Sequence, residues 1–260
     1  MAPCQQKMAA RSTSAPFKPQ AKCYLLIIHL SLAKGAHSTM KAFIFDLDGT
    51  LVDSVYPHTL AWQQALAEYG ITCAAWAIHR RIGMSGELLV RAIAAEQHRR
   101  VSDTDIEKLD KRHARLFQQI SPKSTPTPLP GVPELLRHLR KNKIPYGIAT
   151  SGKQADIKNS LKVLALKSDT VVINGDMVRE VKPEPDLFLL CQQTLNVKPA
   201  DCLVVGDAVW DIHAARRSGI MSAGLLSGGF GEQELYNAGA MRVYRDARAL
   251  LEAIDELGFK

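Results

Sequence analysis

Short apolar runs alternate with helical segments over the second half of the chain, and this alternation constrains the fold more than any other feature. An earlier apolar run, Lys41 to Leu47, stops at a Gly-Thr pair and has the length of a buried parallel strand. Strands that alternate with helices build a parallel sheet covered by helices on both faces. The sequence therefore predicts an α/β fold with a doubly wound, Rossmann-like parallel sheet. We expect further strands at 146–150, 170–173, 202–205, 221–225 and 241–244, and helices at 132–142, 153–165, 185–195, 208–218, 231–238 and 246–257.

The segment between the first strand and this alternation contains no strand pattern. Residues 54–121 have the pattern of successive helices, in which Trp62, Leu66 and Tyr69 recur on one helix face. Five prolines in residues 121–133 form a connector that cannot continue a helix. This pattern predicts an all-α cap domain inserted into the Rossmann-like core. We expect the cap and its return linker over 54–129, and the core over 40–53 and 130–260.

Composition excludes several classes of protein. Of the 260 residues, 46% are hydrophobic and 23% are charged, which is typical of a globular chain and not of a fibrous or disordered one. The longest apolar stretch, Cys23 to Ala33, is interrupted by His29 and Ser31 and is too short to span a bilayer. Five scattered cysteines without CxxC spacing fit neither a disulfide framework nor a zinc site. We therefore expect no membrane partner.

Most of the net charge of +7 lies in residues 1–39, which hold five basic residues and no acidic one. Because residues 40–260 are nearly neutral, nucleic acid is not an expected partner. Three explanations of residues 1–39 stay open: a targeting peptide, an extension that is a disordered tail or the result of a misread start upstream of a true start at Met40, or a structural segment. We favour the extension, and we expect a cytoplasmic protein unless residues 1–39 target it elsewhere.

Polar side chains gather at the ends of the predicted strands, where an open parallel sheet binds its ligands. Asp46 and Asp48 follow the first strand and flank Leu47, so both carboxylates of an alternating segment point the same way. Like charges this close resist joint ionisation unless a cation lies between them or one group keeps its proton. The alternative is a pair of turn aspartates before Gly49.

A second acidic pair follows a later strand. Asp207 ends the run LVVGD, and Asp211 lies one helical turn further on, on the same helix face. Asp207 taken alone could equally be a helix cap. Three or four carboxylates that converge from two strand ends, however, are costly to bury without a cation. A small set of oxygen ligands favours Mg²⁺ over Ca²⁺, so we expect Mg²⁺ as the cofactor.

Two further polar positions suit an anion. Thr150 ends a predicted strand and precedes a helix start, where a hydroxyl and free N–H groups can bind an anion, although a plain helix cap is equally consistent. Lys182 precedes Pro183 and is therefore extended, and taken alone it would be a surface lysine. Together with the carboxylates, these residues fit phosphoryl transfer on a small phosphorylated metabolite.

Four segments in this order, DLDGTLVDS, IATSG, VKPEPD and VGDAVWD, resemble the four motifs of the haloacid dehalogenase-like hydrolase superfamily. The resemblance extends from Met40 to the C-terminus and is to the phosphoglycolate phosphatase and β-phosphoglucomutase branch, whose cap follows the first motif. It implies that Asp46 is a nucleophile that forms an aspartyl-phosphate. It also implies that Asp48 protonates the leaving oxygen and later activates water, which favours phosphatase or phosphomutase chemistry.

The resemblance also implies a set of binding residues. The Asp46 carboxylate, the backbone carbonyl of Asp48 and Asp207 would hold Mg²⁺, and Asp211 would act through water. The phosphoryl oxygens would be bound at the second and third motifs, by Thr150, Ser151, Gly152 and Lys182.

The cap is expected to select the substrate. Arg81, in the segment RRIGMSG, could reach a second anionic group or could be a solvated arginine at a helix end. His58 stands one turn before Trp62, a spacing that resembles sugar-phosphate phosphatases, and could equally be a packed cap histidine. The glycine-rich loop 227–231 near the same edge specifies no ligand.

These observations predict a Mg²⁺-dependent phosphatase of a small monoester, such as a sugar phosphate or phosphoglycolate, active as a monomer or homodimer. A phosphomutase similar to β-phosphoglucomutase is the first alternative. A non-catalytic domain that binds a phospholigand is the second.

Overall fold

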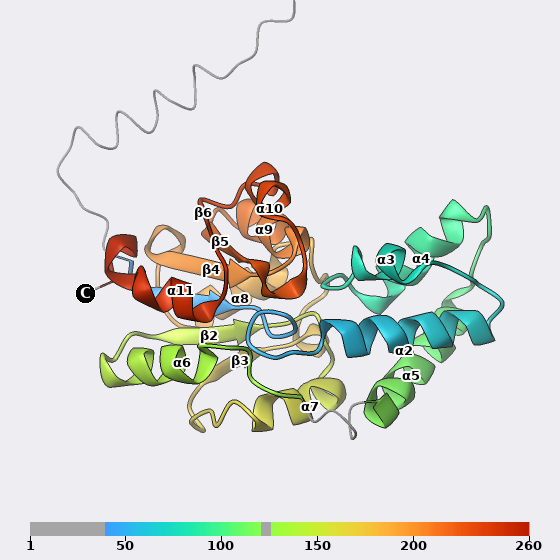
Figure 1. Cartoon of the computed structure of the whole chain (residues 1–260), viewed down its shortest axis with the longest axis horizontal. Helices are drawn as coiled ribbons and strands as arrows, with labels where there is room; N and C mark the ends of the chain where they lie inside the picture. The colour runs from blue at the N-terminus through green and yellow to red at the C-terminus, as the bar shows by residue number, and fades with distance from the viewer. Residues whose placement is uncertain (1–39, 121–125, 260) are drawn as a thin grey trace, which may run out of the picture. The chain divides into compact units, whose positions relative to one another are not determined.

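The computed structural model describes residues 40–120 and 126–259, so the expectations for residues 1–39 lie outside the described residues. In this part of the chain six parallel strands form one sheet in the order β3-β2-β1-β4-β5-β6 (Figure 1). This is the strand order of a doubly wound, Rossmann-like sheet, and it confirms the predicted fold class. The strands are β1 (Ala42–Phe45), β2 (Tyr146–Ala149), β3 (Val171–Ile173), β4 (Cys202–Gly206), β5 (Met221–Leu225) and β6 (Arg242–Tyr244).

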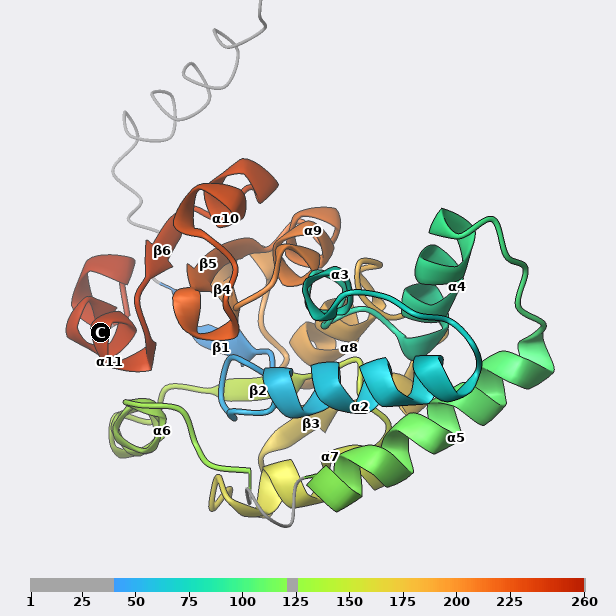
Figure 2. The ribbon, with the colours of Figure 1, turned by 45° about the vertical axis from the view of Figure 1, so that its right-hand side comes forward.

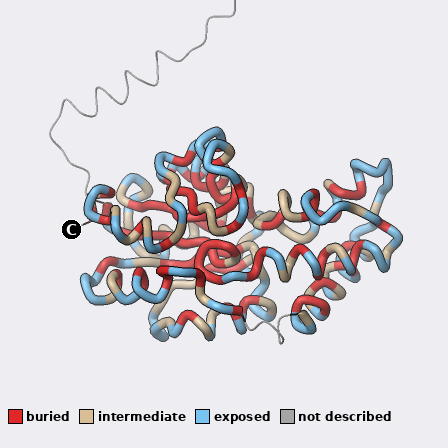
Figure 3. Tube along the Cα trace, in the orientation of Figure 1, coloured by how far each residue is buried: buried red, intermediate tan, exposed pale blue. Residues whose placement is uncertain are grey.

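Side chains of the central strand alternate between two buried layers, as the period of a strand requires. Phe43 and Phe45 belong to the cluster formed with α6 (Val132–Lys141) and α11 (Ala247–Glu252). Ala42 and Ile44 belong to the opposite cluster, with α8 (Asp186–Thr194) and α9 (Val209–Arg217). The sheet is therefore covered on both faces, which is why β1 is apolar throughout and entirely buried. Figure 3 shows buried residues in the interior of the core and exposed residues on the outer turns of its helices. The remaining core helices are α7 (Gln154–Lys162) and α10 (Glu232–Ala238).

Two predicted helices end earlier than expected. The helix expected at 153–165 stops at Lys162, and the chain then turns through Ala165, whose φ is +47°. The helix expected at 246–257 is divided into α11 and a 3₁₀ turn, Ile254–Leu257. Asp246 begins α11 by accepting a hydrogen bond of 2.9 Å from the backbone N–H of Ala249.

The helices of the inserted segment are joined by turns, and in the residues described it adds no strand to the sheet, as predicted. It consists of α2 (Val55–Glu68), α3 (Ala75–His79), α4 (Gly86–Glu96) and α5 (Asp103–Ile120). Helices α2 and α5 lie side by side (Figure 2) and share a buried cluster that includes Trp62 and Leu66. The cap thus has a hydrophobic core of its own. Among the described helices, none is long and apolar enough to cross a membrane.

Sheet topology determines where the polar strand ends meet. The chain runs from β1 outward to β2 and β3, then returns to the other side of β1 to start β4. Asp46 directly follows β1, and Asp207 directly follows β4, its hydrogen-bonded neighbour. In doubly wound sheets the ligand binds outside the carboxyl ends of the strands at such a reversal of strand order. The two acidic motifs therefore meet at the switch point of the sheet.

Candidate active site

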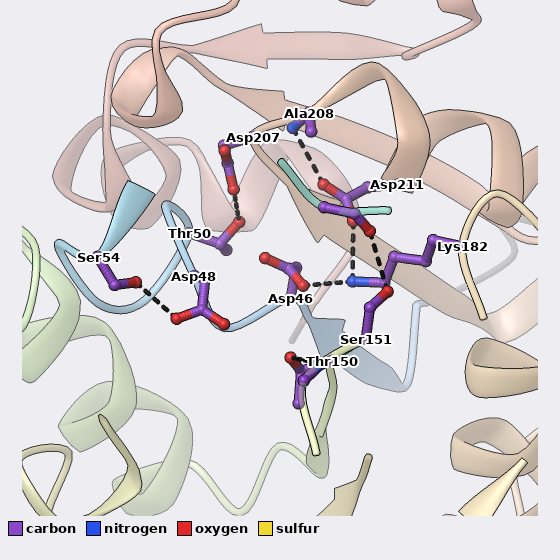
Figure 4. A network of polar contacts seen from close by, with 12 residues as sticks. Asp46, Asp48, Thr50, Ser54, Thr150, Ser151, Lys182, Asp207, Ala208 and Asp211 are labelled. Atoms are coloured by element: carbon purple, nitrogen blue, oxygen red, sulfur yellow. Dashed lines mark hydrogen bonds and ion pairs between the residues drawn. The ribbon is translucent and has the colours of Figure 1, made fainter. Parts of the chain in front are cut away.

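A buried ionic network lies at this switch point (Figure 4). Lys182 is fully buried, and its Nζ donates a hydrogen bond to Oδ1 of Asp46 and lies 2.9 Å from Oδ1 of Asp211. Asp46 and Asp211 are 5% and 1% exposed. Burying three charged groups is favourable only when each charge is matched and its hydrogen bonds are made. Lys182 is therefore part of a buried ionic network in this fold and not the surface lysine of the alternative interpretation.

Asp211 and Asp207 each have a second fixed contact. The other carboxylate oxygen of Asp211, Oδ2, accepts a hydrogen bond of 3.0 Å from the backbone N–H of Ala208 at the start of α9. Oδ1 of Asp207 accepts a hydrogen bond of 2.7 Å from the hydroxyl of Thr50, which is completely buried. Thr50 was not singled out in the sequence, although it belongs to the first motif. The contacts orient both carboxylates toward Asp46.

Repulsion and burial shift the pKa values of these groups. Burial, offset in part by the Lys182 ammonium, raises the pKa of Asp46 to about 7. Burial, with Asp211 and Asp46 nearby, raises the pKa of Asp207 well above its ordinary value of 3.8. Burial alone would lower the pKa of Lys182, but Asp211 and Asp46 raise it above its ordinary range. The single buried ammonium does not neutralise all the carboxylates, so the site favours an added cation.

Three carboxylates have the spacing of a metal site. One oxygen from each of Asp46, Asp207 and Asp211 lies within 4.8 Å of the other two, and all three residues are buried. Hard oxygen donors with a net negative charge fit Mg²⁺. The Asp48 carboxylate is not a member of this group, consistent with the expectation that only its backbone carbonyl would serve as a ligand. The donor set therefore fits the expected cofactor.

Asp48 has a different environment from Asp46, although one residue separates them. The hydroxyl of Ser54 donates a hydrogen bond of 2.6 Å to Oδ1 of Asp48, and Nε2 of His58 lies 3.5 Å from the same oxygen. Burial would raise the pKa of Asp48, but His58 and Ser54 outweigh it and hold that pKa below 3.8. The two carboxylates thus shift in opposite directions: the pKa of Asp46 is raised and that of Asp48 is lowered.

A cavity of about 540 Å³ opens above this network, between core and cap residues. At the core end, Thr150 is buried at the end of β2, and its Oγ1 accepts a hydrogen bond of 3.1 Å from the N–H of Gly152. Ser151 donates a hydrogen bond of 2.9 Å to the cap carbonyl of Gly83. Asp46, Asp48, Thr150, Ser151 and Gly152 all line the cavity, whereas Lys182 lies beneath it and contacts it through Asp46.

The two cap residues singled out in the sequence have different positions. His58 lines the cavity, and its ring stacks on Phe117 with centroids 3.8 Å apart. Arg81 does not line the cavity: its guanidinium donates to the carbonyl of Ala77 and pairs with Glu96. The structure therefore does not bring Arg81 to the place where it would bind a second anionic group, because partners within the cap hold it.

The structure adds His113, which sequence reasoning missed. This residue of α5 is buried, stacks on Trp62 with centroids 4.1 Å apart, and places Nε2 3.1 Å from Nδ1 of His58. Burial, with His58 nearby, lowers the pKa of His113 well below 6.5, so this ring is neutral at pH 7. The sequence did hold a signal for it: His113 lies four residues from each of the apolar residues Leu109 and Phe117, a spacing that places it on the apolar face of a helix.

The glycine-rich loop at 227–231 also belongs to the site. Ser227 donates a hydrogen bond of 2.6 Å to the carbonyl of Gly49 in the first motif. A Cβ on Gly228 would lie 1.7 Å from Oδ2 of Asp207, so only glycine fits there. On the cap side, Nε2 of His79 lies 2.7 Å from the carbonyl oxygen of Gly228. The loop therefore packs between the acidic cluster and the cap, although its sequence specified no ligand.

A Rossmann-like sheet with acidic strand ends and an inserted helical cap defines a class of capped α/β hydrolytic enzymes. The profile of the Haloacid dehalogenase-like hydrolase family matches residues 43–225. The chain belongs to this family and is an enzyme of it, as the resemblance of its four motifs predicted.

Individual relatives cover most of the described chain. A β-phosphoglucomutase from Bacillus subtilis is 33% identical over 73% of this chain and 84% of that protein. Hexitol phosphatase A from Escherichia coli is 35% identical over 65% of this chain and 74% of that protein. Among solved structures, a hydrolase from Pseudomonas syringae is 42% identical, with a TM-score of 0.79 over 83% of this chain and 98% of that chain. The similarity therefore includes both the core and the cap.

Proposed function

We propose that this chain is a Mg²⁺-dependent phosphatase that hydrolyses a small phosphate monoester through a phosphoenzyme formed on Asp46. The observation that carries the proposal is the buried network in which Lys182 pairs with Asp46 and Asp211 beneath the cavity. The similarity to a hexitol phosphatase supports the class of reaction. In this proposal residues 40–53 and 130–260 carry out the chemistry, and residues 54–129 select the substrate.

Substrate binding would begin with the phosphoryl group against the strand ends. Thr150 uses Oγ1 to accept from Gly152, so its hydroxyl proton stays free to donate to a phosphoryl oxygen. Asp46, Asp207 and the Asp48 carbonyl would hold Mg²⁺, and Asp211, whose carboxylate lies near the other two, would act through water. The ion would supply positive charge that stabilises the phosphoryl oxygens. It would also favour the ionised form of Asp46, whose pKa is otherwise about 7.

The reaction would take place in two steps. Asp48 is ionised in the free site, because its pKa lies below 3.8, and it would take up a proton from solvent when the anionic substrate binds beside it. A carboxylate oxygen of Asp46 then attacks phosphorus, the bond from phosphorus to the alcohol oxygen breaks, and Asp48 gives that proton to the alcohol oxygen. Water then attacks the aspartyl-phosphate, Asp48 takes a proton from it, and inorganic phosphate leaves with Asp46 restored. Lys182 would keep Asp46 in one orientation throughout, because it binds Oδ1 from below the cavity.

Phosphate release from p-nitrophenyl phosphate tests the proposal. Wild-type protein should be active with Mg²⁺, inactive in EDTA and reactivated by Mg²⁺, with Ca²⁺ a poor substitute because its larger shell misaligns the reacting groups. Asp46→Asn should lower kcat by about 10⁴-fold or more and prevent covalent labelling by phosphate, because the nucleophile is lost. An exposed aspartate of the terminal 3₁₀ turn offers a control, Asp255→Asn, which should retain wild-type kcat. Activity within twofold of wild type in Asp46→Asn would exclude this mechanism.

A phosphomutase is the second candidate, because the relative from Bacillus subtilis is a β-phosphoglucomutase. A mutase returns the phosphoryl group to substrate and must keep water out meanwhile. Incubation with glucose 1-phosphate separates the two: a phosphatase releases free phosphate, whereas a mutase forms glucose 6-phosphate and requires a bisphosphate activator.

A further inference from the structure

Two backbone segments enclose the carboxylate of Asp207. A Cβ on Gly49 would lie 2.4 Å from Oδ2 of Asp207, and a Cβ on Gly228 would lie 1.7 Å from the same oxygen. The other oxygen, Oδ1, accepts the hydrogen bond of 2.7 Å from Thr50. Because the interior is close-packed, the place of Oδ2 depends on where these backbone segments lie. One of them is the first motif, and the other is the glycine-rich loop 227–231.

The glycine-rich loop is itself bound from two sides. On the core side, Ser227 donates its hydrogen bond of 2.6 Å to the carbonyl of Gly49. On the cap side, Nε2 of His79 lies 2.7 Å from the carbonyl oxygen of Gly228. Since a carbonyl oxygen only accepts, Nε2 carries a hydrogen and donates it. A side chain of the cap therefore binds the residue that confines Asp207.

The ring of His79 has little freedom to leave this position. His79 is the last residue of α3, and its ring stacks with Tyr56 of the cap and with Phe230 of the core, at centroid distances of 5.6 and 5.8 Å. A Cβ on Gly229 would lie 2.9 Å from Nε2, so the loop backbone is in close contact with the ring. A displacement of α3 from the core would therefore either break the hydrogen bond or move the loop.

We propose that His79 is a positioning residue for the metal site: through the carbonyl of Gly228 it holds the glycine-rich loop against Asp207, so that Mg²⁺ binding and docking of α3 on the core favour each other. The inference rests on the metal site of the proposed function. Such a coupling is reciprocal, because the cap changes the affinity for Mg²⁺ by the same factor by which Mg²⁺ changes the docking of the cap. A single hydrogen bond corresponds to a factor of about 3–10.

Calorimetric titration of the metal-free protein with Mg²⁺ tests the proposal without a substrate. His79→Phe keeps an aromatic ring against Tyr56 and Phe230 but cannot donate to Gly228, so the Kd for Mg²⁺ should rise about 3–10-fold. His79→Gln retains an amide N–H that can donate, and its Kd should stay within about twofold of wild type. A Kd of His79→Phe within twofold of wild type would refute the role of His79.

Trp210→Phe is the matched control. Nε1 of Trp210 donates a hydrogen bond of 3.0 Å to the carbonyl of Arg80, the residue after His79, and this second contact between core and cap does not involve the carbonyl of Gly228. We expect its Kd for Mg²⁺ to stay within about twofold of wild type. A rise as large as that in His79→Phe would mean that docking of the cap in general sets the affinity, which would refute the assignment to His79.

Hydrogen exchange measures the reciprocal effect. The amide of Gly229 donates to Leu226 within the loop, at 3.2 Å, and the amide of Ile82 donates to the carbonyl of His79 in the cap, at 3.1 Å. Saturating Mg²⁺ should slow exchange at both amides in wild type, but only at Gly229 in His79→Phe. The wild-type measurement decides the matter if His79→Phe does not fold. Slowing that is confined to the loop in wild type would refute the coupling.

Failure of the inference and failure of the proposed function are distinguishable. Wild-type protein that binds Mg²⁺ with a Kd insensitive to His79 keeps the metal site and refutes the coupling. Absence of Mg²⁺ binding in wild type would refute the metal site, and the inference with it. The expected differences in Kd in a protein that releases no phosphate from p-nitrophenyl phosphate would support the inference and refute the phosphatase.

Discussion

The two ends of the cavity are built from charged residues in different ways. At the strand ends, Asp46, Lys182 and Asp211 are buried, and Lys182 contacts both carboxylates directly. At the cap end, the ion pair of Lys153 with Asp110 joins side chains that are 57% and 24% exposed. Water screens the second pair but not the first. The charged side chains at the strand ends are therefore held in one arrangement, whereas the exposed side chains at the cap end are free to change rotamer.

In the proposed function, this difference separates chemistry at the strand ends from substrate selectivity at the cap. Phosphoryl transfer requires reacting groups placed within fractions of an ångström, which a buried network with few alternative rotamers can provide. Recognition of the alcohol part requires contacts that can differ between enzymes without disturbing that network. Placing the first on strand ends and the second on an inserted helical segment satisfies both conditions.

Among substitutions at the two ends of the cavity, the largest expected effect is a loss of kcat at the strand ends. Asp48→Asn should lower kcat by about 10²–10⁴-fold, because an amide cannot transfer the proton while it can still accept from Ser54. The matching cap-end variant, Asp110→Asn, should change kcat less than tenfold. The kcat values of both variants are measured from steady-state phosphate release. A greater loss of kcat in Asp110→Asn than in Asp48→Asn would contradict the assignment of catalysis to the strand ends.

A change of the buried lysine should have the largest effect on stability. Lys182→Met leaves Asp46 and Asp211 buried without their counterion, so the free energy of unfolding of the metal-free protein should fall by about 3–5 kcal/mol at pH 7. Urea unfolding measures it. Lys41→Met, which removes an exposed pair with Asp201, should cost less than about 1 kcal/mol and serves as the control. Equal losses in the two variants would contradict the distinction between buried and exposed pairs.

Without metal, the buried carboxylates should make stability depend on pH. The pKa of Asp46 is raised from 3.8 to about 7, and that of Asp207 is also raised. Between pH 4 and 7 the folded state therefore holds protons that the unfolded state has released. The contribution of these groups to the free energy of unfolding falls as pH rises, by up to about 1.4 kcal/mol per pH unit for each carboxyl.

His113 has the opposite effect on the pH dependence of stability. Because its pKa is lowered in the folded state, its contribution to the free energy of unfolding rises as pH rises toward 6.5. The difference between wild type and Asp207→Asn, measured by urea unfolding in EDTA at pH 5 and pH 7, separates the carboxylate contribution. We expect a steeper fall with pH in wild type. Mg²⁺ should raise the stability of wild type at pH 7, since it binds the ionised carboxylates. Parallel pH profiles in EDTA would contradict the raised pKa of Asp207.

The smallest effect is expected at the cap end. Lys153→Met removes the ion pair with Asp110, and the free energy of unfolding should change by less than about 1 kcal/mol, with the change shrinking further at high salt. Thermal and urea unfolding at low and high ionic strength measure it. A loss above 2 kcal/mol that persisted at high salt would mean that this pair is as rigid as the buried one.

Most of the fold could be predicted from the sequence, because its elements depend on local patterns. The alternation of apolar runs and helices predicted the sheet, and the missing strand pattern after residue 54 predicted the helical cap. Helix ends were less certain. Helix α11 ends at Glu252 and continues as a 3₁₀ turn, a change that the apolar pattern of 246–257 does not indicate.

The site could be predicted in part. Asp46, Asp207 and Asp211 were expected together because the ends of parallel strands share one edge of a sheet, and the structure places them together. Arg81 was expected as a candidate for substrate contact, but Ala77 and Glu96 hold it within the cap. His113 was missed because its contact with His58 joins residues 55 positions apart.

The sequence by itself determined which residues stand at the strand ends and that a helical segment interrupts the sheet, since both follow from periodicity and order along the chain. Only the tertiary structure decided that Lys182 is buried against two carboxylates and that the pKa values of Asp46 and Asp48 shift in opposite directions. The physical reason is that burial, charge interaction and hydrogen bonding depend on distances between segments far apart in the chain. Those distances exist only after the helices and strands have packed.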